Sequence, residues 1–413
     1  MPVINPYQNV DFQNDQKVLS CSHEHVYFLD DKDQEGGDNM IDHLYSKGFR
    51  HLAFSEYWRP FPYGEDDYPK DFYGSAPMYP LGRWYNGDLP GDLIASPNSE
   101  SFGAHFEPGH IITLGSLAST IGNHGERFGL SEFQGVRLWD VSNNERITLI
   151  NQQIWDYILN GIEDPNGPGT IGGLLHADGG GMYQAHFDVS MEQLYKNLDR
   201  DPRWLGMAMY NDRRDKEDVS IARADRGYAT KEWDTALATG RRCWGFSESD
   251  RGRRGANTLL LSEFTEHEAL KAYREGRFYC RTKWEENPTL YFTKIDAGED
   301  KIEVETVGAG NGVRIISEKG VVATSETNSI EYTYPKDLTN EVDLTFLRVE
   351  AFGDLFDPES EADVREYPLP NYDTGERYDD EIFSQPIMFR TKKEVDSIVR
   401  KRRNRKYFAA GII

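Results

Sequence analysis

The stretch Leu19-Ser20-Cys21-Ser22-His23-Glu24-His25 decides how the rest of the chain is interpreted. A β-prone run over residues 17–21 leads directly into a His-x-His pair. Because alternate side chains of a strand share one face, we expect His23 and His25 to point the same way. Two imidazoles on one face at the end of a strand can chelate a divalent transition metal. A lone His-x-His pair is a weak signal, so two surface histidines in a loop are the alternative at this point.

The chain has 413 residues, enough for one large domain and a smaller one. A hydrophobic content of 38% and an aromatic content of 13% provide the material for a packed interior. No apolar run reaches the roughly 18 residues of a membrane helix, and the first residues lack the basic-then-apolar order of a signal peptide. The three cysteines, Cys21, Cys243 and Cys280, have no paired spacing, which favours a reduced compartment or buried thiols.

The composition is strongly acidic, with a formal net charge of −24 from 46 basic and 70 acidic residues. Only 17 of the basic residues are lysines. An acidic, lysine-poor chain is typical of a high-salt cytoplasm, where salt screens the self-repulsion of the protein. We therefore expect a location in the cytoplasm of a halophile or in a particle (a virion) assembled there, with an ordinary acidic enzyme as the alternative. Nucleic-acid binding is not expected, because a phosphate backbone requires a basic face.

Strands and helices alternate in the first two-thirds of the chain. A helical apolar pattern over residues 40–45 stops at Gly48 and is followed by a strand over residues 51–54. A strand, a helix and a strand within about 40 residues indicate a βα unit and a parallel sheet. Residues 58–95 are interpreted as a long ordered loop over the strand ends. Further helices are predicted over residues 143–158, 190–198, 233–240 and 265–276, and further strands over residues 172–178 and 205–210.

The pattern changes near residue 285. Short alternating runs at residues 301–306, 313–317 and 344–351 predict the antiparallel strands of a small β-sandwich. Residues 391–408 are helix-prone and basic, which indicates a clamp onto the protein's own acidic face, a handle for a protein partner, or a solvated helix. The predicted organisation is an N-terminal arm (1–16), a metal-binding barrel (17–285), a β-sandwich (286–390) and a basic helical tail (391–413).

Seven histidine and acidic side chains fall where a predicted strand starts or stops. In an α/β barrel the strand ends form the catalytic rim, and divalent ions are bound by such mixed sets of histidines and carboxylates. Surface acids and satisfied core histidines are the alternative for each residue taken alone. The candidates are His23, His25, Glu56, Glu100, His110, His176 and Asp250. The remaining histidines lack this context and are interpreted as structural: His43, His51, His105, His124, His186 and His267.

In this order the set resembles the polymerase and histidinol phosphatase (PHP) superfamily of metal-dependent phosphoesterases, over about residues 17–285. His23-Glu24-His25 is similar to the family's His-x-His motif, and Ser55-Glu56-Tyr57 is loosely similar to its Thr-Asp-His motif. Glu100, His110 and His176 resemble the family's glutamate and the histidines after it, and Asp250-Arg251-Gly252 resembles its closing Asp-x-His. Tyr57 and Gly252 stand where the family has histidines, and each missing ligand loosens an ion and the water it positions.

The resemblance implies an α/β fold, a PHP-like distorted (β/α)7 barrel with a C-terminal antiparallel β-sandwich. It implies one to three divalent metal ions (Zn, Mn or Fe) on the seven candidates, with Asp250 and His176 as catalytic residues. The implied reaction is hydrolysis of a small-molecule or surface phosphoester by a metal-bound hydroxide. Three arginines are expected either to receive the substrate phosphate or only to pair with surface acids: Arg251, Arg253 and Arg254.

A rival hypothesis comes from another functional class. The chain would be a structural or adhesive subunit of a larger assembly, for example a virion component of a halophile's virus, that keeps a degenerate barrel as a scaffold. The two missing ligands and the basic tail favour it. A module that binds carbohydrates or surfaces through the aromatic residues of 58–95 is a third hypothesis.

Overall fold

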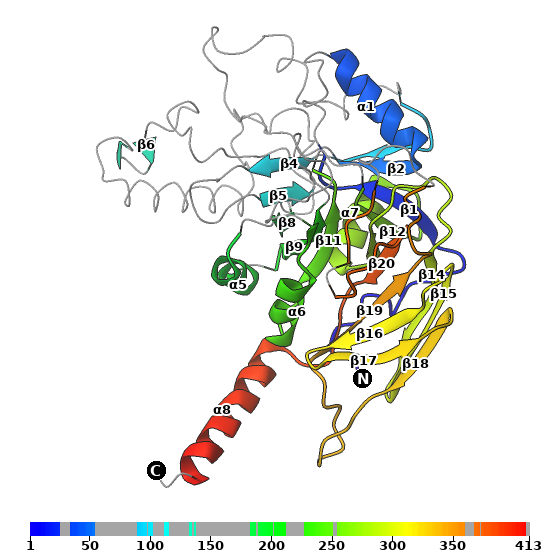
Figure 1. Ribbon diagram of the computed structural model, residues 1–413. Helices are drawn as coiled ribbons and strands as arrows, with labels where there is room; N and C mark the ends of the chain where they lie inside the picture. The colour runs from blue at the N-terminus through cyan, green and yellow to red at the C-terminus, as the bar shows by residue number, and fades with distance from the viewer. Residues whose placement is uncertain are drawn as a thin grey trace.

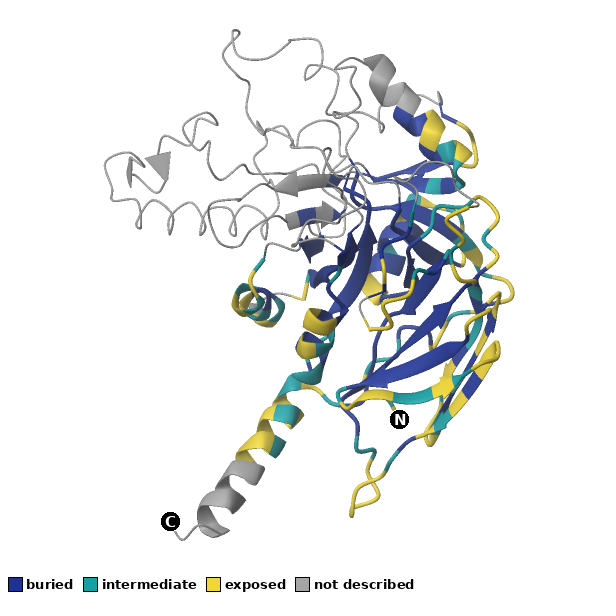
Figure 2. Cartoon of the chain, viewed as in Figure 1, coloured by how far each residue is buried: buried dark blue, intermediate teal, exposed yellow. Residues whose placement is uncertain are grey.

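The computed structural model describes residues 1–24, 34–53, 89–96, 98–101, 111–114, 132–133, 136–137, 182–186, 189–200, 202–211, 227–250, 254–359, 367–371 and 373–409. These residues form a mixed α/β structure in which buried strands make up the interior (Figures 1 and 2). Two large open sheets lie side by side at the centre, and a smaller sheet covers one end (Figure 1).

A ten-stranded sheet runs through the described part of the chain. β1 (Gln16–Cys21) pairs in parallel with β2 (Phe49–Leu52), which pairs in parallel with β3 (Ile94–Ala95). The other edge of β1 pairs antiparallel with β12 (Ala256–Leu261), and β12 pairs with β13 (Phe278–Arg281). The sheet continues through β20 (Glu381–Ser384), β19 (Phe346–Phe352), β16 (Val313–Ser317) and β17 (Gly320–Ser325), with β21 (Ile387–Met388) on β19. Strands from both sides of residue 285 therefore belong to one sheet.

A six-stranded sheet carries much of the remaining N-terminal part. Its strands β8, β9 and β11 run parallel, whereas β4, β5 and β10 join antiparallel. The strands are β4 (Asn98–Ser101), β5 (Ile111–Leu114), β8 (Met182–Ala185), β9 (Trp204–Asn211), β10 (Gly227–Tyr228) and β11 (Trp244–Glu248). A separate short hairpin joins β6 (Glu132–Phe133) to β7 (Val136–Arg137).

The C-terminal part contains the antiparallel strands that the alternating sequence pattern predicts. β14 (Tyr291–Ala297), β15 (Lys301–Val307) and β18 (Ser329–Thr333) form a three-stranded sheet. Alternate residues of β15, Ile302 and Val304, point into a core shared with Ile315 and Val349 of the ten-stranded sheet. This packing of one sheet on another gives the β-rich half its interior.

The helices lie outside the sheets, and the last one projects away from them (Figure 1). They are α1 (Gln34–Ser46), α5 (Met191–Arg200), α6 (Thr230–Ala238), α7 (Glu266–Glu275) and α8 (Lys392–Ala409). None of the described helices combines the length and apolar character that a membrane span requires.

Local signals fix the ends of α7. The Thr265 hydroxyl accepts a hydrogen bond from the Glu268 backbone N–H at 3.2 Å, as an N-cap residue should. Gly276 ends the helix in the left-handed conformation at φ 75°, which a residue with a side chain adopts only at a cost. The Glu268 carboxylate binds Arg277 and Lys271 instead of returning to the Thr265 N–H, so only half of the predicted capping box forms.

The distorted (β/α)7 barrel that the resemblance implies is not formed by the described strands. Their sheets are open, since the ten-stranded order ends at β17 and β3, and they mix parallel with antiparallel neighbours, since β1 pairs in parallel with β2 and antiparallel with the distant β12. The predicted helix over residues 143–158 and the strand over residues 172–178 lie outside the described residues.

Candidate metal centre

Two side-chain amides hold β11 against the ten-stranded sheet. The Gln385 amide accepts from the Gly245 N–H and donates to the Gly245 carbonyl, both at 2.8 Å. Two residues further along β11, the Asn257 amide accepts from the Ser247 N–H at 3.0 Å and donates to its carbonyl at 3.1 Å. Each amide thus occupies the place of a neighbouring strand, so the buried backbone groups of β11 are satisfied without a ladder on this edge.

Asn257 also ties β11 to the segment that follows β1. Its Nδ2 donates to the Ser22 Oγ at 3.0 Å, and the residue is fully buried on β12. Ser22 precedes His23 in the chain, and Ser247 precedes Glu248. One buried side chain therefore sets the positions of two strand ends that each carry a polar side chain into the same space.

The loop after β11 completes this arrangement. The Asp250 N–H donates to the His23 carbonyl at 3.2 Å, and Asp250 has a positive φ of 43°, which is uncommon for a residue with a side chain. Gly255 follows closely, where a Cβ would lie 2.3 Å from the Glu248 carbonyl oxygen. These contacts place Asp250 beside the segment that follows β1. Such strained conformations cluster at functional sites.

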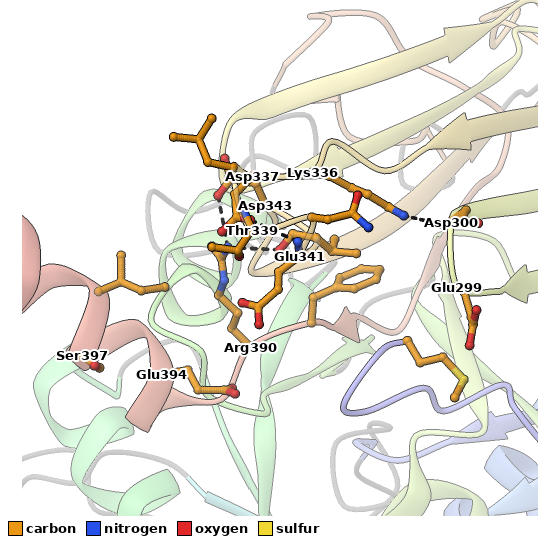
Figure 3. Close-up of a pocket in the computed structure, with 16 residues that line it drawn as sticks. Glu299, Asp300, Lys336, Asp337, Thr339, Glu341, Asp343, Arg390, Glu394 and Ser397 are labelled. Carbon is orange, nitrogen blue, oxygen red and sulfur yellow. Dashed lines mark hydrogen bonds and ion pairs between the residues drawn. The ribbon is translucent and has the colours of Figure 1, made fainter.

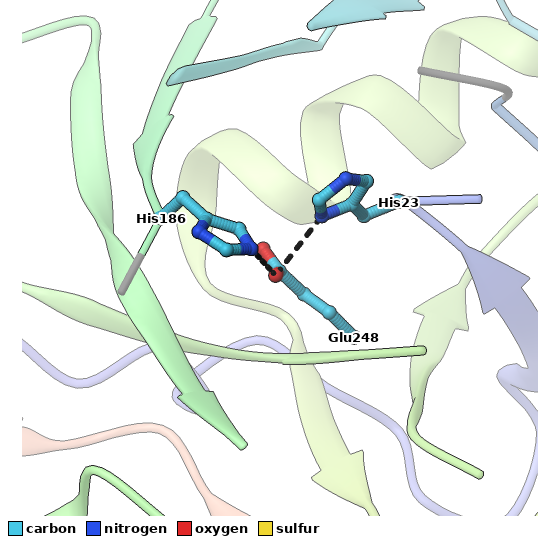
Figure 4. Close-up of side chains that lie close together, drawn as sticks. All are labelled: His23, His186 and Glu248. Atoms are coloured by element: carbon cyan, nitrogen blue, oxygen red, sulfur yellow. Dashed lines mark hydrogen bonds and ion pairs between the residues drawn. The ribbon is translucent and has the colours of Figure 1, made fainter. Parts of the chain in front are cut away.

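Four polar side chains meet at these strand ends: His23, His186, Glu248 and Asp250. His23 follows β1, His186 follows β8, and Glu248 ends β11 (Figure 4). Glu248 Oε2 lies 3.0 Å from His23 Nδ1 and 3.5 Å from His186 Nε2. The Asp250 carboxylate lies 3.7 Å from His23 Nε2 and 3.5 Å from His186 Nε2. The four side chains thus enclose one small space, and all four residues are at most 2% exposed.

The donor set fits a divalent transition metal ion. Imidazole and carboxylate are ligands that Zn, Mn and Fe accept. Two ligand atoms about 2.0–2.1 Å from a tetrahedral zinc ion lie roughly 3.3 Å apart, and Glu248 Oε2 lies 3.0 Å from His23 Nδ1 and 3.5 Å from His186 Nε2. Asp250 contacts His23 through the other ring nitrogen, Nε2, so it stands beside this three-residue group. The set contains two carboxyl groups, and two ionised carboxylates would be balanced by one divalent cation. Among the described residues, His23, His186 and Glu248 are the group whose ligand atoms gather within 4.8 Å of one another.

Two further amides orient the glutamate. Gln184 Nε2 donates to Glu248 Oε1, and Asn211 Nδ2 donates to Glu248 Oε2 at 3.1 Å. Asn211 also lies 3.2 Å from His186 Nε2. Gln184 and Asn211 are fully buried on β8 and β9. Such supporting hydrogen bonds fix ligand orientation in metal sites.

Neighbouring buried groups are kept neutral. Burial raises the pKa of the Cys21 thiol well above its ordinary value, and the Glu24 carboxylate adds to this. A thiol with a raised pKa is a poor metal ligand, since the thiolate is the binding form. Burial also lowers the pKa of His51 to about 3. Its two ring nitrogens are taken up by Ser20 Oγ at 2.7 Å and Ser96 Oγ at 2.8 Å, which agrees with its interpretation as structural.

The predicted site residues have different outcomes. His23 and Asp250 lie together in the cluster. Glu100 lies on β4, and its side chain is outside the described part of the structure. Arg254 is buried and donates to the main-chain carbonyl of Asp379. Several residues of the sequence argument lie outside the described residues: His25, Glu56, Tyr57, His110, His176, Arg251, Gly252 and Arg253.

Sequence reasoning missed two members of the cluster. His186 was interpreted as structural, yet it directly follows the buried strand β8 and contacts both carboxylates. Glu248 received no role, although it continues the alternation of Trp244 and Phe246 on one face of β11. An acidic residue at the end of an apolar period-2 run was the signal that could have identified it.

No family model matches the chain, and no curated protein matches it. One solved crystal structure from Bacteroides vulgatus is similar to it at a TM-score of 0.39 and 10% sequence identity, over 80% of this chain and 88% of that chain. That structure is of a two-domain protein containing a predicted PHP-like metal-dependent phosphoesterase. A likeness this distant identifies neither fold nor activity, so the functional argument depends on the geometry of the cluster.

Proposed function

We propose that the chain is a metal-dependent hydrolase of phosphoesters. The observation that carries the proposal is the buried cluster of His23, His186, Glu248 and Asp250 at three converging strand ends. The sequence resemblance assigns ligand roles to His23 and Asp250, and these two residues contact each other although they lie in distant parts of the chain. This convergence supports the PHP-like interpretation over an unrelated pair of polar residues.

Each residue of the cluster has a distinct role in the proposed site. His23 and His186 present imidazole nitrogens with ring planes at 77°, and Glu248 and Asp250 present carboxylate oxygens. Gln184 and Asn211 fix both oxygens of Glu248, so this ligand needs no reorganisation to bind. A divalent ion, when bound, supplies Lewis-acid polarisation of phosphoryl oxygens and acidifies a coordinated water. Burial keeps bulk water away and thereby strengthens these electrostatic interactions.

The remaining predicted ligands belong to the same proposal. We propose that His25, Glu56, Glu100, His110 and His176 contribute to one or two further ion positions, as the family resemblance implies. His176 and Asp250 are the proposed catalytic residues. The substrate is proposed to be a small-molecule or surface phosphoester.

Elemental analysis of the native chain tests the metal site first. We expect at least one equivalent of Zn, Mn or Fe. Glu248→Gln and His186→Ala should each lower the affinity by more than about 100-fold, the upper range for loss of a merely supporting residue. His267→Ala, which removes an exposed histidine on α7, is the matched control and should retain the metal.

Hydrolysis assays on a generic phosphodiester and phosphomonoester test the reaction. We expect turnover by the metal-loaded chain and loss of turnover in Glu248→Gln. A chain that binds no metal under metal-replete conditions would contradict the proposal altogether. A metal-loaded chain without activity on either ester class would contradict the phosphoesterase assignment and favour the assembly-subunit hypothesis.

A further inference from the structure

Helix α8 contributes no residue to the candidate metal centre. It begins after Thr391 and extends away from the body of the protein (Figure 1). Its first half carries Val395, Ile398 and Val399 at i, i+3 and i+4, which places them on one face of the helix. Val399 is 58% exposed. Val395 and Ile398 are half-buried, so the exposed part of this stripe is at Val399.

A groove of about 1050 Å³ lies at the base of this helix (Figure 3). The loop over residues 336–343 forms one side, and the first turns of α8, including Ile398, form another. Two exposed apolar residues line it, Leu338 and Met1, the latter 78% exposed. Two of the large exposed apolar side chains of the described chain therefore line one groove, next to the helix that carries a third, Val399, and such gatherings mark interaction surfaces.

The rim of the groove is acidic. Asp300 pairs with Lys336 at 2.6 Å and Asp343 with Arg390 at 3.1 Å. Glu299 and Glu341 are exposed and have no ion-pair partner among the described residues. The carboxylates that line the groove are those of Glu299, Asp300, Asp337, Glu341, Asp343 and Glu394. A cationic partner would therefore be favoured at this rim.

The second half of α8 carries positive charge. Six of the seven residues 400–406 are basic, in a chain whose net charge is −24. In one chain this stretch lies one to two helical turns beyond the groove-lining residues 394–398, because an α-helix rises 1.5 Å per residue. The helix therefore carries its own basic residues away from the acidic groove at its base.

We propose that α8 pairs antiparallel with α8 of a second copy of this chain. A two-fold axis near Val399 places residue 394 of one helix opposite residue 404 of the other, and residue 398 opposite residue 400. Each basic stretch then lies on the acidic groove of the other copy, and the apolar stripes meet at the centre. The interface is self-complementary, as two-fold symmetry requires, with an apolar centre and a charged rim.

A second copy fits better than an unrelated acidic partner. The groove and the basic stretch occur on the same chain at the spacing that an antiparallel helix pair needs. An acidic partner would satisfy the tail and leave the groove and the apolar residues Leu338 and Met1 exposed. The pairing is independent of the metal centre.

A charge-exchange experiment tests the pairing on the full chain by light scattering at one fixed salt concentration. The wild type should have the mass of two 47.3 kDa chains. The tail variant Arg400→Glu/Arg402→Glu/Arg403→Glu and the groove variant Glu299→Lys/Glu341→Lys should each be monomeric. An equimolar mixture of the two variants should dimerise again, because each tail then meets a groove of opposite charge.

A control variant separates the interface from the overall charge. Glu326→Lys/Glu359→Lys makes the same charge change on exposed carboxylates outside the groove and should remain dimeric. A monomeric wild type at micromolar concentration would overturn the proposal, and so would a dimer that survives the tail variant. Failure of the mixture to dimerise would overturn it as well, since the circular dichroism of both variants reports whether they are folded.

Discussion

Replacing Asn257 by leucine should weaken metal binding without touching any ligand. The Asn257 amide holds the Ser247 N–H and carbonyl and the Ser22 hydroxyl, at 3.0 to 3.1 Å. Ser22 and Ser247 each directly precede a member of the cluster, His23 and Glu248. Leucine has a similar volume and no polar atoms, so these three buried groups lose a partner and the two strand ends lose their link.

The expected loss of metal affinity is about 10–100-fold, the range for removing a supporting residue of a metal site. This corresponds to about 1.4–2.7 kcal/mol at 25 °C. The two orphaned backbone groups of Ser247 also lower the free energy of unfolding by about 2–6 kcal/mol, at 1–3 kcal/mol for each unsatisfied group.

Gln385→Leu is the matched control. It removes the equivalent pair of hydrogen bonds from Gly245, so its loss of stability should be similar. Gly245 lies three residues from Glu248, and Gln385 does not contact the segment after β1, so the metal affinity should stay close to that of the wild type. The assays are competition with a chromophoric chelator, the visible spectrum of the cobalt form, and urea unfolding of the metal-free chains.

Equal metal affinities for the two variants would refute the positioning role of Asn257. This outcome differs from failure of the metal site itself, in which the wild type would bind no ion. A cobalt spectrum changed in Asn257→Leu and unchanged in Gln385→Leu would show that ligand geometry, rather than general stability, has been altered.

Three further predictions concern stability. Burial raises the pKa of Glu381 from 4.5 to about 8. The folded state then binds a proton that the unfolded state has released, so the free energy of unfolding should decrease as the pH rises from 4.5 to 8. Urea titrations at several pH values should show a flatter slope in Glu381→Gln. Burial lowers the pKa of His51 to about 3; the unfolded chain then binds the extra proton, so stability should fall as the pH drops from 6.5 toward 3, and an unchanged slope in His51→Gln would contradict this. Thr265→Ala removes the N-cap hydroxyl of α7 and should cost about 1 kcal/mol in urea unfolding, whereas Thr374→Ala in an exposed turn should cost less.

The elements of the fold were largely predictable. The apolar spacing before Gly48, the Thr265 cap and the Gly276 stop each act within a few residues, and the structure places helices α1 and α7 accordingly. The alternating runs over residues 301–306 and 313–317 correspond to β15 and β16. The helix-prone basic tail corresponds to α8.

The arrangement of those elements was predicted less well. The βα pattern indicated a parallel sheet and the family resemblance implied a distorted (β/α)7 barrel, whereas the described strands form open, mixed sheets. Whether β1 meets β2 alone or also the distant β12 depends on the packing of the whole chain. Local pattern carries no information about which distant strand occupies an edge.

The sequence by itself determined that a histidine follows the first strand and that an aspartate follows a late one, because strand ends are marked locally by apolar runs and turns. Only the tertiary structure decided that His186 and Glu248 join them. His23 and Glu248 are 225 positions apart, and their contact depends on the Asn257 amide, which joins β11 to the segment after β1. Hydrogen bonds of this kind join residues with no common sequence pattern, since each is specified by the meeting of two separately folded segments.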